Sequence, residues 1–170
     1  MATSSTDTKS LIASPVVTGA IAGCLATIPM SIFMLLAQRY LPHEQRYSLP
    51  PEIITYDIAR RANLHWKLSK RQTVLATLGA HLGYGAAVGI LYAPLCRLLP
   101  TKSPLIKGSI VGLLVWIGSY MALLPLLRVA ESAYREPLHR NVMMLVAHQV
   151  WGGATGLIAT GWRQNILRVS

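Results

Sequence analysis

Composition places this chain in a membrane rather than in water. Of its 170 residues, 52% are hydrophobic and only 13% are charged, and the mean hydropathy is +0.42. These values exclude an ordinary soluble domain. Four long apolar stretches account for them, at residues 14–38, 73–96, 105–127 and 141–162. Each exceeds the roughly 20 residues that cross a hydrocarbon core. We therefore predict an all-α protein with four transmembrane helices, forming a single membrane domain over residues 1–170.

The formal net charge of +10 raises nucleic acid as a partner. The basic residues lie beside the apolar stretches, however, and the sequence contains no groove-reading motif or aromatic stacking platform. We expect no nucleic-acid partner. Instead, we expect the basic loops to contact anionic lipid headgroups.

Each apolar stretch carries two glycines four residues apart. Four residues are just over one helical turn, so each pair makes a smooth stripe on one face of its helix. Such stripes let helix backbones approach closely in lipid. We predict that the four helices pack through these stripes, formed by Gly19, Gly23, Gly85, Gly89, Gly108, Gly112, Gly152 and Gly156.

The connection after the first stretch is long enough to hold a helix of its own. The segment 50–52, Pro-Pro-Glu, is typical of a helix start, because it places proline in the first turn and an acid near the positive end of the dipole. We predict a short amphipathic helix over residues 51–63 that lies at the headgroup level, with docking to a partner protein as the alternative. Its expected apolar face consists of Ile53, Ile54, Ile58 and Ala62, opposite Asp57, Arg60 and Arg61.

Four crossings place both termini on one side of the membrane. The first and third connections contain ten basic residues: Arg39, Arg46, Arg60, Arg61, Lys67, Lys70, Arg71, Arg128, Arg135 and Arg140. The other side contains six: Lys9, Arg97, Lys102, Lys107, Arg163 and Arg168. The positive-inside rule therefore predicts cytoplasmic first and third connections, and periplasmic termini in a bacterial inner membrane.

The two halves of the chain resemble each other. Residues 80–89 and 147–156 match at Ala, His, an aromatic residue, Gly, Ala and Gly in the same register. Upstream, the Ser-Pro pair at 14–15 recurs at 103–104, and the first glycine pair recurs with the same spacing. We predict two parallel helical-hairpin repeats, at about 14–96 and 103–162.

Two histidines lie inside predicted spans, at matching positions of the two halves. His81 and His148 each precede the first glycine of their pair by four residues, so both rings share the glycine face of their helix. Tyr84 and Trp151 follow one turn later. An ionisable side chain within a span is a functional-site hypothesis by default. These four residues are therefore the candidate ligand or proton site.

Three interpretations of the histidine pair remain open. The rings are neutral and hydrogen-bond a carbonyl, serine or tyrosine within the bundle, which fixes the helix register. Alternatively, they ligate a metal or the iron of a b-type haem, although the glycines on the same face imply helices too close for a porphyrin. In the third interpretation they titrate and make the protein proton-linked, although no other ionisable residue lies at that depth.

Catalytic motifs are absent from the sequence. It contains no paired carboxylates at membrane depth, no nucleophile and base set, no phosphate-binding glycine loop and no metal signature. We expect a protein that is not an enzyme and that needs no cofactor.

The segments 19–23, 26–31 and 49–55, together with His81-x-x-Tyr84-Gly85 and His148-x-x-Trp151-Gly152, resemble the YagU-like family of small bacterial membrane proteins. The resemblance implies an inner-membrane location and a part in acid resistance, and it names no substrate, cofactor or catalytic residue. Our primary expectation is a structural or accessory membrane protein, in contact with a membrane-protein partner or a second copy of itself. The alternative is a proton-linked or ligand-binding protein that uses the histidine pair.

Overall fold

The computed structural model describes residues 14–128 and 134–169, with side chains described as far as residue 165. Helices make up the regular structure of these residues. In chain order they are α2 (Pro15–Ala37), the 3-10 turns η1 (Gln38–Tyr40) and η2 (His43–Gln45), α3 (Pro50–Arg61), α4 (Lys70–Gly89), α5 (Tyr92–Arg97), α6 (Pro104–Ile117), the π-helical segment η3 (Gly118–Leu123), α7 (Leu124–Leu126) and α8 (Leu138–Val169). Lys9 and the side chain of Arg168, both used in the topology prediction, lie outside the described residues.

Four helical segments are long and apolar enough to cross a membrane. They run over Pro15–Tyr40, Lys70–Arg97, Pro104–Leu126 and Leu138–Asn165. The four predicted spans are confirmed to this extent, with bounds that move by at most a turn. Local signals explain the helix starts: proline occupies the first turn of α2 and α6, and Ser69 forms a capping box with Gln72 before α4.

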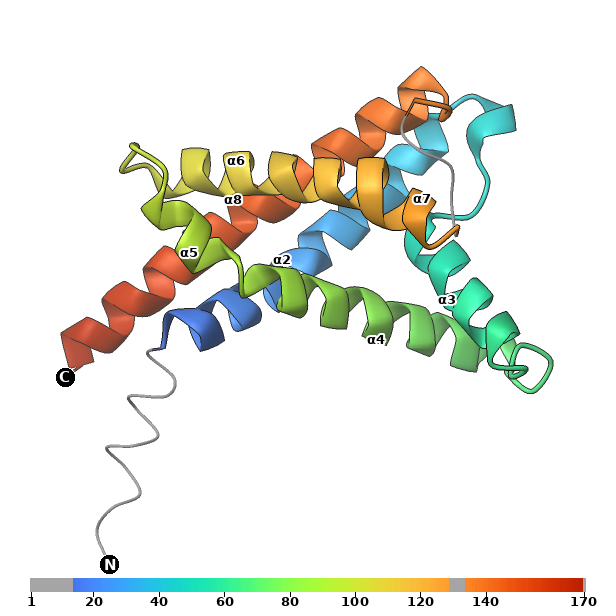
Figure 1. Cartoon of the computed structure of the whole chain (residues 1–170), viewed down its shortest axis with the longest axis horizontal. Coiled ribbons are helices and arrows are strands. Elements are labelled where there is room, and N and C mark those ends of the chain that lie inside the picture. The colour runs from blue at the N-terminus through green and yellow to red at the C-terminus, as the bar shows by residue number, and fades with distance from the viewer. Residues whose placement is uncertain (1–13, 129–133, 170) are drawn as a thin grey trace, which may run out of the picture.

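The long helices are arranged as a row of neighbours. α2 and α8 run side by side in opposite directions in the middle, with α4 and α6 on either side (Figure 1). α4 packs on α2, α2 packs on α8, and α8 packs on α6, whereas α4 has no extensive contact with α6 or α8. Three helix interfaces are therefore closed, and the one between α4 and α6 is open.

Glycine brings the helices of each hairpin together. Between α2 and α4, a methyl group added at Gly19 would collide with the carbonyl of Gly89, and one added at Gly23 with the carbonyl of Gly85. Between α6 and α8, Gly108 lies in the same way against the carbonyl of Gly152. A side chain at any of these positions would force two backbones apart.

The two hairpins meet at different turns. In the sequence alignment Gly19 corresponds to Gly108, and its structural partner Gly89 corresponds to Gly156. Gly108 instead meets Gly152, four residues earlier in α8, and Gly156 lies against the carbonyl of Pro104. The second hairpin is therefore offset by about one helical turn from the register of the first. The duplication itself stays a prediction.

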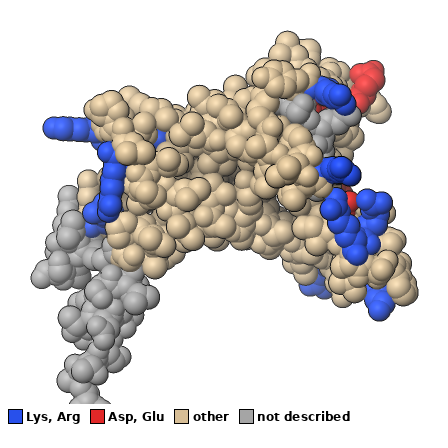
Figure 2. All heavy atoms as spheres, viewed as in Figure 1, with Lys and Arg blue, Asp and Glu red and all other residues tan. Residues whose placement is uncertain are grey.

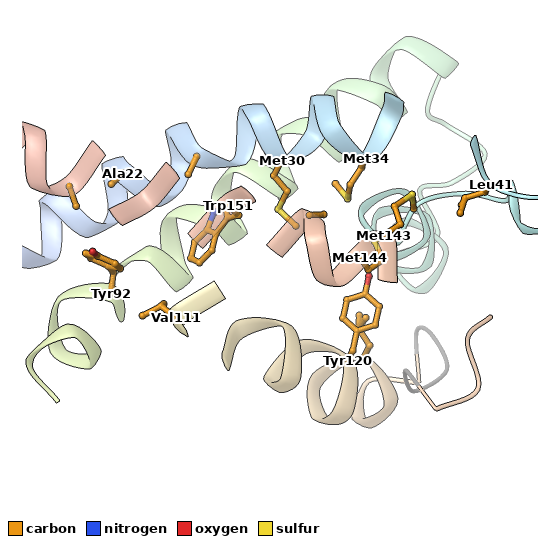
Figure 3. Close-up of a cluster of buried hydrophobic side chains, with 14 residues drawn as sticks. Ala22, Met30, Met34, Leu41, Tyr92, Val111, Tyr120, Met143, Met144 and Trp151 are labelled. Carbon is orange, nitrogen blue, oxygen red and sulfur yellow. The ribbon is translucent and has the colours of Figure 1, made fainter. Parts of the chain in front are cut away.

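The core lies along the contact between α2 and α8. Met30 and Met34 of α2 lie toward Met143 and Met144 of α8 in Figure 3, and all four are at most 6% exposed. Methionine is unbranched and flexible, so it fills the irregular space between two packed helices. Trp151 of α8, 3% exposed, continues this core toward α4.

The sequence predicted each span as one continuous α-helix, but the second and third spans are interrupted. α4 ends at Gly89 and the chain resumes as α5, while α6 passes into the π-helical segment before α7. Pro125 has no amide hydrogen to donate to the carbonyl four residues earlier, so the regular ladder is lost there. The wider π turn directly before this proline accommodates the change.

The predicted helix of the first connection is present as α3, but it is turned differently from the prediction. Its buried residues are Thr55, Asp57 and Ala59, whereas Ile58 is 58% exposed. Asp57 is covered by two arginines from the following turn, with Arg60 Nη2 at 2.9 Å and Arg61 Nε at 2.6 Å from its carboxylate oxygens. The hydrogen bond from Arg60 lowers the pKa of Asp57. The location of α3 at the headgroup level stays a prediction.

Basic side chains gather at the two ends of the molecule. On the face drawn in Figure 2, Lys and Arg occupy both ends and an uncharged band separates them. We call one end the α3 end, which carries residues 38–69. The other is the α5 end, where α2 begins and residues 98–103 join α5 to α6 (Figure 1). This pattern suits a molecule that spans a bilayer with its ends in the two headgroup layers.

Candidate ligand cavity

A cavity of about 300 Å³ lies beside the open interface between α4 and α6. Its walls come from α2, α3, α4, α6, η3, α7 and α8, and most of the surface is apolar. A volume of this size is at the lower end of the range typical of small-molecule sites. The four side chains predicted as a site all line it: His81, Tyr84, His148 and Trp151.

His81 lies on α4, where it is partly buried. Its Nδ1 is 3.1 Å from Oγ of Ser31 on α2. The Ser31 hydroxyl donates its only proton to the carbonyl of Thr27, at 2.8 Å. Ser31 can therefore only accept from the ring, so His81 carries its proton on Nδ1 and Nε2 is left as an acceptor.

His148 reaches the same protonation state through a different partner. The ring is 6% exposed, and its Nδ1 is 2.8 Å from the carbonyl oxygen of Met144, one turn earlier in α8. Because a carbonyl only accepts, Nδ1 must donate. The Tyr120 ring packs edge-on against the imidazole, with centroids 5.9 Å apart. No hydrogen bond joins Nε2 of either histidine to another of the described residues, so both rings retain an acceptor.

Both histidines thus have a hydrogen bond of the kind expected if the rings are neutral and hydrogen-bonded within the bundle. A serine and a carbonyl were both among the expected kinds of partner. The partner of His148 belongs to its own helix, so this bond positions the ring but does not tie two helices together. Whether the pair also binds a ligand or a proton stays a prediction.

Tyr84 and Trp151 connect the helices around the cavity. The Tyr84 hydroxyl is 2.8 Å from Oγ of Ser119, which joins α4 to the π-helical segment across the open interface. Trp151 Nε1 donates to the carbonyl of Gly23 at 3.0 Å and joins α8 to α2. Trp151 is therefore a buried wall of the cavity, and Tyr84 stands at its edge.

The cavity has exposed lining residues at the gap between the second and third spans. Tyr84, Leu123 and Ile58 line it and are nevertheless 39%, 37% and 58% exposed. Tyr84 and Leu123 lie within the second and third spans. A molecule dissolved in the bilayer would reach the cavity between these two spans without crossing water.

Sequence reasoning missed the contribution of α3 to this cavity. Pro50, Pro51, Ile54 and Ile58 close its outer end. These residues come from the first connection, which was predicted to rest on the membrane surface. Nothing in the local pattern distinguishes an apolar residue that faces lipid from one that covers a neighbouring cavity.

Arg140 was also misjudged, as one of the loop residues expected to contact lipid headgroups. It is 1% exposed. Its guanidinium donates to the carbonyls of Gln45 at 3.2 Å, Tyr47 at 3.1 Å and Ser48 at 2.6 Å. It also pairs with Glu136, at 3.4 Å, and lies 3.7 Å from the centre of the Tyr47 ring. Arg140 therefore fixes the first connection to the start of α8.

The described residues include no group of three or more His, Cys, Asp or Glu side chains that could hold a metal ion. Within the described part of the chain, His81 and His148 place two imidazole rings at one cavity. The cavity lining contains no Lys or Arg to pair with the acid groups of a porphyrin. The haem alternative therefore gains no support from the surrounding side chains.

Comparisons with curated proteins and with solved structures found no match. One family model, described as a family of unknown function (DUF6789), matches residues 13–165. That range contains all four candidate membrane spans. The chain is a multi-span membrane protein, and it belongs to the DUF6789 family.

Proposed function

We propose that this protein binds a lipid-soluble molecule in the cavity between α4 and α6, and that it acts as a non-enzymatic protein of a bacterial inner membrane. One observation carries the proposal: a mostly apolar cavity holds two histidines whose Nε2 atoms have no hydrogen-bond donor among the described residues. An apolar wall with a few convergent polar groups is typical of a small-molecule site.

The chemistry of the cavity selects a ligand with a proton to donate. Each Nδ1 is occupied by a protein acceptor, so a hydroxyl on the ligand would complete the hydrogen bonding of Nε2 on His81 or His148. The remainder of the ligand would contact apolar side chains such as Met30, Val88 and Leu124. We expect an apolar molecule that bears a hydroxyl group.

A pair of matched probes tests this proposal. A bromo-substituted fatty alcohol and the bromoalkane that lacks its hydroxyl differ only in the donor, and bromine quenches nearby tryptophan emission. We expect the alcohol to quench Trp151 at a lower concentration than the alkane in detergent-solubilised protein. Losing a hydrogen bond worth about 1.4 kcal/mol corresponds to a tenfold weaker affinity.

Histidine variants make the test specific. The double variant His81→Phe, His148→Phe should bind both probes alike, whereas His139→Phe, at an exposed position outside the cavity, should keep the preference for the alcohol. Helix content measured by circular dichroism controls for folding. Equal quenching by the two probes in the unmodified protein would refute the proposal.

A second candidate function is that of a structural or accessory protein, as expected from the sequence. Gly79 and Gly83 favour it, because both lie on α4 with open space where a side chain would be. A helix of another membrane protein, or of a second copy, could approach closely there. Disulfide formation between copies carrying Gly83→Cys, in a background without Cys24 and Cys96, tests for self-association.

The acid-resistance role implied by the YagU-like resemblance and the proton-linked interpretation also stay predictions. The haem alternative has a direct test: an absorption spectrum of the purified protein. A Soret band would support it, and its absence would remove it.

A further inference from the structure

A second cavity lies at the α5 end, and it shares no lining residue with the cavity that holds the histidine pair. Its volume is about 260 Å³, and α2, α5, α6 and α8 contribute to its lining. Four basic side chains line it: Arg97, Lys102, Lys107 and Arg163. Arg97, Lys102 and Lys107 lie within eleven residues of the chain, and the packing of α8 on α6 brings Arg163 to them.

These four cations have no acidic partner among the residues that the structure describes. The described acids are Glu44, Glu52, Asp57 and Glu136, and all of them belong to the first and third connections, at the α3 end. No ion pair involves any of the four cations within 14–128 and 134–165. Like charges that share a cavity repel one another, and a bound anion would remove that repulsion.

The backbone adds to the positive potential. α2 begins at Pro15 and α6 at Pro104, and both prolines line the cavity. The start of a helix carries unpaired amide groups and the positive end of the helix dipole. Ser14 provides no side-chain cap for α2, whereas Ser103 caps α6. The positive ends of two helix dipoles therefore lie at the cavity that the four cations line.

We propose that this cavity binds the phosphate group of an anionic phospholipid. Arginine matches phosphate with two parallel hydrogen bonds, and lysine supplies a compact charge. The cavity lies at one end of the spans, where headgroups are found, and apolar side chains such as Ala93 and Ala159 stand beside the cations. A lipid would place its phosphate among the cations and its glycerol and acyl chains along that apolar wall.

Phosphatidylglycerol and a diacylglycerol with the same acyl chains test the proposal, since only the first has a phosphate. Native mass spectrometry of the detergent-solubilised full chain gives the affinity for each. We expect phosphatidylglycerol to bind and diacylglycerol not to bind. The double variant Lys107→Gln, Arg163→Gln should bind phosphatidylglycerol about tenfold more weakly, as expected when charge-assisted contacts are lost.

A matched control removes the same charge from the other end. Lys70→Gln, Arg71→Gln lies at the exposed start of α4, outside the cavity, and should bind phosphatidylglycerol as the unmodified protein does. Competition by millimolar inorganic phosphate would show that free phosphate also occupies the cavity, and absence of competition would show that the lipid is required. Equal binding of the two lipids, or equal losses in the two double variants, would overturn the proposal.

Discussion

Replacing Arg140 with methionine should destabilise the protein more than replacing any exposed arginine. Methionine keeps much of the volume but removes the guanidinium that donates to three carbonyls of residues 45–48. It also leaves Glu136 without its ion-pair partner. The local consequence is that the first connection is no longer held against the start of α8.

The magnitude follows from burial. Hydrogen bonds from a charged donor contribute about 1.5 to 3 kcal/mol each. Three of them do not add in full, because removing the guanidinium also removes the cost of burying it. Breaking a buried charged pair by removing one partner typically costs about 3 to 5 kcal/mol. Since Arg140 is 1% exposed, we expect a loss in this range.

Two measurements check this expectation. Unfolding by increasing amounts of SDS in mixed micelles, followed by circular dichroism, gives the change in stability. Limited trypsin digestion reports the connection, because its release should speed cleavage after Arg46. Arg39→Met is the matched control, since Arg39 is exposed at the same end of the molecule. Indistinguishable unfolding and digestion of the two variants would refute the proposed role of Arg140.

Three further predictions test packing, orientation and pH dependence. Gly152→Ala should lower the thermal stability in detergent, because its methyl group would meet the Gly108 carbonyl. Gly79→Ala, which places its methyl group in open space, should be neutral or stabilising. Equal effects of the two variants would contradict packing through the glycine stripe. Cysteines placed near Arg46 should be protected from an impermeant reagent in intact cells and those near Lys102 labelled, and the reverse pattern would invert the predicted topology. The pKa of Asp57 is lowered in the folded protein, so ionised Asp57 stabilises the fold above the ordinary pKa of 3.8, and this stabilisation is lost as the pH falls through the lowered pKa. The stability of Asp57→Asn should therefore lack this dependence on acidic pH. An acid-unfolding curve identical to that of the unmodified protein would contradict the prediction.

The spans and the glycine stripes could be predicted from the sequence because both depend on local patterns. An apolar run of sufficient length is a transmembrane helix whatever surrounds it. The glycine pairs lie at a spacing that presents one face, and all eight meet backbone or side-chain atoms of a neighbouring helix. The position of His81 and His148 four residues before those glycines was enough to direct both toward the interior.

Features that depend on distant segments could not be predicted in the same way. Arg140 looks like any basic residue at a loop, and its burial depends on carbonyls contributed by a segment more than 90 residues earlier. Likewise, the register between α6 and α8 differs by about one turn from that between α2 and α4, and the sequence match between the halves gives no sign of this difference. The orientation of α3 also involves distant segments, because α3 packs on α4 and Arg61 Nη2 donates to the carbonyl of Leu127 at 2.8 Å.

The unequal interfaces of the four spans bear on how such a protein could evolve. If the halves descend from one ancestral hairpin, an early pair of identical copies would have formed two equivalent interfaces, between α2 and α8 and between α6 and α4. Only the first is closed here. Once the copies were joined in one chain, each interface could change without altering the other. The α2–α8 interface could then be selected for tight packing and the α4–α6 interface for access to the cavity. Two identical subunits cannot separate these roles, because symmetry makes their two interfaces the same.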